Sequence, residues 1–105
     1  MILPCIYIAD TKRMGRGVFT NENIAEGTII ETSPVIVMSR EERKLLDRTL
    51  LHDYIFEWGP KNDQCCMALG YIAVYNHSYQ SNCEYEMDFN KQVMNIKTVR
   101  FIQAG

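Results

Sequence analysis

The sequence predicts a mainly β domain with one or two short helices and several small sheets. Short β-branched and apolar runs recur along the chain, about ten in all, and polar or glycine-containing loops separate them. Only residues 39–51 combine a helical period with a start signal. The length of 105 residues, with 47% hydrophobic and 23% charged residues, suits one globular domain with a modest core.

The first third of the chain consists of strands and turns. Residues 4–9 alternate weakly and are β-branched, so they are expected to form a strand, and residues 17–20 resume extended structure after a polar, glycine-containing loop. Residues 21–27 are expected to form a turn. Residues 28–39 are β-rich, and Pro34 marks a break or an edge in this strand.

The helix over residues 39–51 is predicted from both its start and its period. Ser39 is a good N-cap residue, and Glu42 three positions later completes a capping box. Arg43 and Asp47 are four residues apart and can pair on the exposed face. The residues expected on one side of this helix are Leu45, Leu46, Thr49 and Leu50.

The second half returns to strands. Residues 53–58 are expected to be extended, and the apolar residues 64–76 to form a short strand and then a short buried helical turn. Residues 82–101 give the clearest hairpin, with Asn90-Lys91 at its turn. One face of its first strand carries Cys83, Tyr85, Met87 and Phe89, and the other carries Glu84, Glu86 and Asp88.

Composition excludes several classes of function. A net charge of −2 gives no indication of nucleic-acid backbone binding, and no apolar run reaches the ~18 residues of a membrane span. The first residues lack a basic signal-peptide region. The four cysteines form no C-x-x-C pair, and Cys65 and Cys66 are adjacent, which rarely permits a bridge. We therefore expect reduced, buried cysteines in an intracellular protein.

Two stretches have both a structural and a functional interpretation. The glycine pair around Arg16 is not a dinucleotide fingerprint, because the third glycine is missing and strand residues follow in place of a helix. It forms either a tight turn or a loop whose backbone approaches a ligand closely. Tyr54, after Asp53, is either a core aromatic residue or the wall of a pocket for a flat or cationic ligand.

The triplet Asn76-His77-Ser78 has four interpretations. A glycosylation site requires a secreted chain, which the cysteines argue against. A zinc site is disfavoured because His52 and His77 lie far apart and no cysteine spacing fits beside them. Adjacent serine and histidine cannot easily face each other as nucleophile and base, and no G-x-S-x-G is present. A hydrogen-bonded turn remains on local chemistry alone.

The order of these motifs resembles the SET domain family of protein lysine methyltransferases. Gly-Arg-Gly-Val-Phe at 15–19 is followed by an Ile-x-x-Gly turn at 24–27, Asp-Tyr-Ile-Phe at 53–56, and Tyr-Asn-His-Ser-x-x-x-Asn at 75–82 before a hairpin. The resemblance covers nearly the whole chain and is greatest to minimal viral and bacterial SET proteins. It implies a single domain over residues 1–105, with a β-clip-like SET fold of several small sheets.

The resemblance also implies a site for S-adenosylmethionine and a channel for lysine. Asn76 would bind near the amino acid end of the cofactor and His77 near its adenine, while Asn82 is expected to be structural. The strand tyrosine Tyr85 would line the lysine channel as the catalytic candidate. The residues implied to bind the cofactor are Met14, Arg16, Gly17, Tyr54, Tyr75, Asn76 and His77.

Three departures from the family pattern qualify these expectations. Family members carry Glu-Leu-x-x-x-Tyr after a second Ile-x-x-Gly turn, but the sequence stops at the turn over residues 101–105, so we expect a domain that lacks its principal catalytic tyrosine segment. Tyr79 occupies the position of a zinc-binding cysteine, so no metal is expected. Residues 73–75 replace the usual Arg-Phe-Ile, which removes a basic contact and keeps an aromatic one.

The reaction implied by the resemblance is methyl transfer to a lysine of a histone or another basic protein. The acidic face of the hairpin suits a basic peptide, although a solvated face explains it equally well, and a peptide can also add as a strand to a sheet edge. The alternatives are an inactive SET-like module that binds a peptide or partner protein, and a β-rich structural protein. The modest core leaves a homodimer open. The expected location is cytoplasmic for a bacterial protein and nuclear for a eukaryotic or viral one.

Overall fold

The computed structural model describes residues 1–12, 15–61, 63–75 and 82–105. Its described part contains seven strands in two antiparallel sheets, which confirms the mainly β prediction of short strands and small sheets. The smaller sheet pairs β1 (Ile6–Asp10) with β2 (Arg16–Thr20). The larger has the order β4-β5-β3-β7-β6 and comprises β3 (Ile29–Met38), β4 (Ile55–Trp58), β5 (Gln64–Ala68), β6 (Cys83–Asp88) and β7 (Val93–Thr98).

Strand β3 crosses the whole larger sheet and changes its partner at Pro34. Residues 29–34 pair with β7, and residues 35–38 pair with β5. Pro34 therefore does not break the strand. Because proline lacks an N–H group, it is tolerated where one ladder ends and another begins. Its carbonyl still accepts a hydrogen bond from Leu69 N–H at 3.1 Å.

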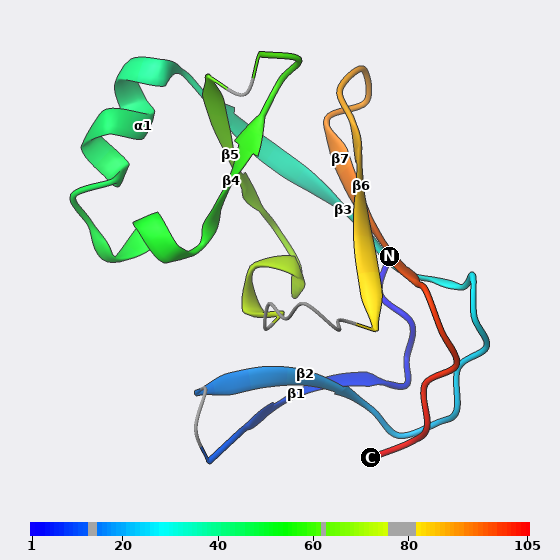
Figure 1. The fold of residues 1–105 in the computed structure, drawn as a ribbon. Coiled ribbons are helices and arrows are strands. Elements are labelled where there is room, and N and C mark those ends of the chain that lie inside the picture. The colour runs from blue at the N-terminus through cyan, green and yellow to red at the C-terminus, as the bar shows by residue number, and fades with distance from the viewer. Residues whose placement is uncertain (13–14, 62, 76–81) are drawn as a thin grey trace.

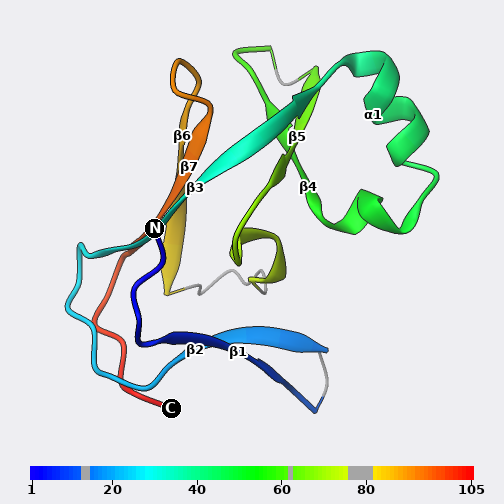
Figure 2. The ribbon, with the colours of Figure 1, turned by 180° about the vertical axis from the view of Figure 1, so that it is seen from behind.

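The larger sheet curls until its two edge strands face each other (Figures 1 and 2). Phe56 of β4 meets Tyr85 of β6 edge to face, with ring centroids 5.3 Å apart, and Trp58 meets Phe89 at 4.9 Å. The inner face of the curl holds the core, whose largest fully buried apolar side chains include Ile72, Met94 and Ile96.

The predicted helix starts where expected and ends early. Helix α1 (Arg40–Leu46) has the full capping box: Glu42 N–H donates to Ser39 Oγ at 3.1 Å, and Ser39 N–H donates to Glu42 Oε1 at 2.9 Å. The expected extension to residue 51 is wrong. Thr49 Oγ1 donates to the Leu46 carbonyl and accepts from Leu51 N–H, which starts the separate 3-10 helix η1 (Leu50–Asp53).

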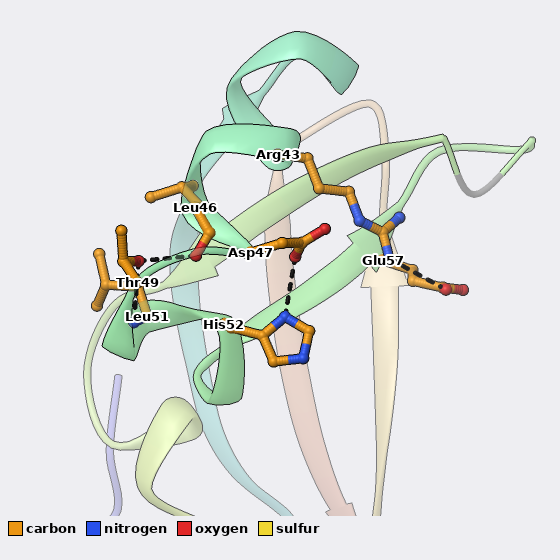
Figure 3. A network of polar contacts seen from close by, with 7 residues as sticks. All are labelled: Arg43, Leu46, Asp47, Thr49, Leu51, His52 and Glu57. Carbon is orange, nitrogen blue, oxygen red and sulfur yellow. Dashed lines mark hydrogen bonds and ion pairs between the residues drawn. The ribbon is translucent and has the colours of Figure 1, made fainter.

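The expected apolar side of this helix is also not buried. No residue of α1 is buried, and Leu45 and Leu50 are 67% and 75% exposed. Polar contacts instead attach the helix to its neighbours, as Figure 3 shows: Arg43 Nη2 lies 3.3 Å from Glu57 Oε1 of β4, and His52 Nδ1 lies 2.9 Å from Asp47 Oδ1.

The hairpin forms in the predicted place with a longer turn. Strands β6 and β7 pair from Cys83 opposite Thr98 to Asp88 opposite Val93. Four residues, 89–92, connect them, so Asn90-Lys91 is the centre of the turn and Phe89 belongs to it, not to the strand. Asp88 Oδ1 accepts the N–H groups of Asn90 and Lys91 and stabilises the turn.

The two Ile-x-x-Gly stretches pair with each other. Ile24 and Ile102 exchange both backbone hydrogen bonds, at 2.8 and 2.9 Å, and Figure 1 shows the two segments side by side. Gly105 N–H donates to the Thr20 carbonyl at 2.9 Å. This pairing places the last described residues beside β2.

None of the helices in the described part of the chain is both long enough and apolar enough to cross a membrane.

Candidate functional site

A pocket of about 710 Å³ lies between the small sheet and the inner face of the curled sheet. Its volume falls within the range of small-molecule sites. Strands β1 and β2 contribute one wall, and β4, β6 and β7 contribute the other. The lining is mainly apolar and includes Ile6, Val18, Phe56, Tyr75, Tyr85 and Ile96.

Four aromatic side chains line this pocket: Phe19 of β2, and a group of three formed by Phe56, Tyr75 and Tyr85. Phe56 and Tyr85 meet across the curl of the sheet, and Tyr75 approaches from the end of the 3-10 helix η2 (Ile72–Val74). Tyr85 is 46% exposed, so its ring borders both the pocket and solvent. Aromatic faces attract cations and exclude water. The pocket therefore suits a ligand or a reacting group that carries positive charge.

Tyr75 is held with its phenol inside the protein. Ile72, which is 1% exposed, anchors η2 in the core, and Tyr75 N–H closes the turn by donating to the Ile72 carbonyl at 3.3 Å. Burial raises the pKa of the Tyr75 phenol strongly, and the negative charge of Glu31 raises this pKa further. The phenol therefore stays neutral at physiological pH and does not act as a base.

Cys83 contributes a thiol to the same pocket. Burial raises the pKa of the Cys83 thiol above its ordinary value. A neutral thiol is a weak nucleophile, so this side chain is not expected to react with a ligand in the pocket.

The structure brings together two of the predicted site residues, Tyr75 and Tyr85. Arg16, which is exposed, and Gly17, which is buried, lie at the start of β2 opposite β1, and Tyr54 ends η1 with 37% of its surface exposed. These three do not line the pocket. The predicted residues Met14, Asn76 and His77 lie outside the described residues, and Asn82, expected to be structural, borders the pocket.

Sequence reasoning missed two residues that shape this site. Phe56 lies in the motif at 53–56, in which the sequence points to Tyr54 as the pocket wall. The alternation of Phe56 and Trp58 in a short strand was the available signal, because such residues share one face. Glu31 was missed as well, although a single carboxylate inside the β-rich run 28–39 is unusual and points to a buried partner.

The described residues contain no group of three or more His, Cys, Asp or Glu side chains placed to hold a metal ion. The pocket instead fits an organic ligand, because its lining is apolar and aromatic with few polar groups.

Comparisons with known proteins agree with this fold. The SET domain profile matches residues 15–105, so the chain belongs to the SET domain family, as its motifs indicated. A relative from Schizosaccharomyces pombe, "Histone-lysine N-methyltransferase, H3 lysine-37 specific", is 34% identical over 101 residues, which cover 95% of this chain and 67% of the relative.

A solved structure is also similar. The crystal structure of a candidate histone methyltransferase from Plasmodium falciparum superposes with a TM-score of 0.72 at 32% sequence identity. The match covers 98% of this chain and 88% of that one. The similarity therefore extends through both sheets and is not limited to one motif.

Proposed function

We propose that this protein transfers a methyl group from S-adenosylmethionine to the side-chain amine of a lysine in a protein substrate. The observation that carries the proposal is the pocket in which Phe56, Tyr75 and Tyr85 converge between the two sheets. Membership of the SET domain family and the 34% identical histone-lysine methyltransferase support it.

The pocket residues suit this reaction. S-adenosylmethionine, when bound, supplies a methyl group on a positively charged sulfur. A free lysine has a pKa of about 10.4, so its amine must lose a proton before it attacks. An apolar, aromatic lining favours the neutral amine through desolvation. The hydroxyl of Tyr85 can orient the amine, and the neutral phenol of Tyr75 can position the methyl donor, because positioning accounts for much of the rate of such transfers.

The cofactor is proposed to lie against the glycine-containing start of β2 and the Asn-His motif. Gly17 has no side chain, which lets a ligand approach the backbone closely. The motif residues Asn76 and His77 follow Tyr75 directly in the sequence. The full proposed set is Met14, Arg16, Gly17, Tyr54, Tyr75, Asn76 and His77.

The substrate is proposed to be a histone or another basic protein. Strand β6 is an edge of the larger sheet and carries Glu84, Glu86 and Asp88 on one face. Glu84 also lines the pocket. A basic segment that adds as a strand along β6 would meet these carboxylates and bring its lysine to the pocket. Lys97 opposite Glu84 offsets part of this negative charge.

Titration calorimetry with S-adenosylmethionine tests the cofactor, and mass spectrometry of histone H3 incubated with protein and cofactor tests the transfer. We expect binding and a gain of one or more methyl groups on lysine. The change Asn76→Ala should weaken binding. Binding without transfer to any basic protein would favour an inactive SET-like module, and no binding would remove the proposal. An intracellular location and a homodimer are also proposed; the four free cysteines support the first.

A further inference from the structure

Glu31 is a fully buried carboxylate in the middle of β3. Its exposed fraction is 0%, and it lies opposite Ile96 on the inner face of the sheet. Its Oε2 atom accepts two hydrogen bonds, from Ser33 Oγ at 2.7 Å and from the backbone N–H of Tyr71 at 2.9 Å. A buried carboxylate is unfavourable in an apolar core unless its oxygens are satisfied, so its presence here requires a reason.

The second of these bonds joins β3 to residues 70–75. The backbone at Gly70 packs directly on the carboxylate: a Cβ atom there would overlap Glu31 Oε2 and lie 2.5 Å from Ser33 Oγ. Tyr71 then begins η2, and its carbonyl accepts the N–H of Val74 at 2.9 Å. Glu31 therefore fixes the start of the segment that carries Tyr75 into the pocket.

Two polar atoms in this cluster lack a hydrogen-bond partner among the described residues, Glu31 Oε1 and Tyr75 Oη, and both are buried. The charge of Glu31 also raises the pKa of the Tyr75 phenol, after the larger effect of burial. Glu31 thus acts on both ends of residues 71–75, by a hydrogen bond at one end and by its field at the other. Incompletely satisfied buried groups are typical of functional sites, because packing alone would replace them with apolar side chains.

We propose that Glu31 is a positioning residue that sets the placement of residues 71–75 and, through Tyr75, the affinity for the methyl donor. The role rests on the proposed function, which places Tyr75 at the cofactor. Glu31 does not line the pocket, so it acts through Tyr71 and Tyr75 and not by touching the ligand. The sequence continues from Tyr75 directly into Asn76 and His77, so the same anchor immediately precedes the other proposed cofactor residues.

The test compares Glu31→Gln with the unmutated 105-residue chain in two measurements. Amide hydrogen exchange by NMR reports on residues 71–75 without any ligand. Calorimetry with S-adenosylmethionine reports the affinity. The amide that replaces the carboxylate is uncharged but can still accept, so both hydrogen bonds to Oε2 are weakened and not removed. We expect faster exchange in residues 71–75 and an affinity about tenfold lower, because bonds to a charged acceptor are stronger than bonds to a neutral one. Ser33→Ala, a milder change at the same carboxylate, should act in the same direction and serves if Glu31→Gln does not fold.

Thr98→Val is the matched control. Thr98 is 1% exposed in the same sheet, and its Oγ1 bonds with Ala25 O at 2.8 Å and Thr28 N at 2.9 Å, away from residues 70–75. The Thr98→Val variant should have a lower melting temperature. Its affinity for S-adenosylmethionine should stay within about twofold of that of the unmutated chain, as expected for a distant site.

A second measurement separates positioning from a general loss of stability. The double variant combines Glu31→Gln with Tyr75→Phe. If Glu31 acts through Tyr75, the fold-loss of affinity in the double variant should be smaller than the product of the fold-losses in the two single variants. Faster exchange in residues 71–75 with unchanged affinity, or an equal loss of affinity in Thr98→Val, would overturn the role. Absence of cofactor binding by the unmutated chain would instead remove the proposed function itself.

Discussion

Phe56 and Tyr85 lie on strands at opposite edges of the larger sheet, yet their rings meet edge to face with centroids 5.3 Å apart. Three strands separate β4 from β6 in the sheet order, so this contact exists only because the sheet curls (Figures 1 and 2). Both rings line the pocket. The wall of the site is therefore a product of sheet curvature and not of neighbouring positions in the sequence.

Replacing Phe56 with alanine should weaken both the fold and the site. We expect the free energy of unfolding to fall by about 2 kcal/mol, less than for a fully buried ring because Phe56 is only partly buried. Methyl transfer should fall as well, because Tyr85 loses the ring against which it packs. Urea unfolding and a transfer assay on the same samples measure the two effects.

Phe89→Ala is the control for this change. Phe89 makes a similar edge-to-face contact with Trp58, at 4.9 Å, but neither of these residues lines the pocket. It should lower stability while leaving transfer close to that of the unmutated chain. Equal losses of transfer in Phe56→Ala and Phe89→Ala would show that the curl, and not the placement of Tyr85, limits activity.

Elements whose signals are local were predictable from the sequence. The capping box of Ser39 and Glu42 and the hairpin around Asn90 depend on residues a few positions apart, and both are confirmed. The length of the helix was not predictable from its period, because Thr49 bonds to the backbone on both sides and starts a new 3-10 turn.

The pocket required tertiary information that no local pattern carries. Tyr75 and Tyr85 were named through a family resemblance, and the structure brings both to one pocket. Phe56 joins them only through the curl of the sheet. Glu31 gains its importance from Gly70 and Tyr71, which lie far along the chain and reach it only in the folded protein.

Gly70 should tolerate no side chain. Gly70→Ala combines a positive φ of +69° with overlap on Glu31, so we expect a loss of more than about 3 kcal/mol or failure to fold. Gly27→Ala is the comparison, since φ is +80° but no atom lies within 4 Å of its Cβ position. That change should cost about 1 kcal/mol, from backbone strain alone. Similar losses at the two positions in urea unfolding would mean that contact with Glu31 is unimportant.

The buried thiol of Cys66 should make the fold sensitive to alkali. Burial, and then the neighbouring Cys65, raises the pKa of the Cys66 thiol from 9.0 to about 11. The unfolded chain ionises first, so the stability linked to this thiol is complete below pH 9 and is lost as pH rises through about 11. The loss should be roughly 2 kcal/mol. Urea unfolding from pH 8 to 11 measures it, and Cys66→Ala should flatten the slope; an unchanged slope would assign the sensitivity elsewhere.

The hydroxyl groups of Tyr85 and Tyr75 can be removed while both rings are kept, and the two changes should differ. Tyr85 is 46% exposed and keeps its contact with Phe56 as phenylalanine, so Tyr85→Phe should hardly change stability. If its hydroxyl orients the lysine amine, kcat should fall about tenfold to a hundredfold with little change in KM.

Tyr75→Phe removes a buried hydroxyl that has no partner among the described residues. An unsatisfied buried polar group destabilises the folded state. We therefore expect the free energy of unfolding of this variant to be about 1 kcal/mol higher than that of the unmutated chain. Because the Tyr75 phenol stays neutral and does not act as a base, the pH dependence of kcat should keep its shape in this variant, following deprotonation of the lysine amine alone. Thermal unfolding and steady-state rates across pH 7 to about 10 test both statements. A destabilised Tyr75→Phe variant would show that the hydroxyl is hydrogen-bonded in solution, and a pH profile that changes shape would return Tyr75 to the acid–base chemistry of the site.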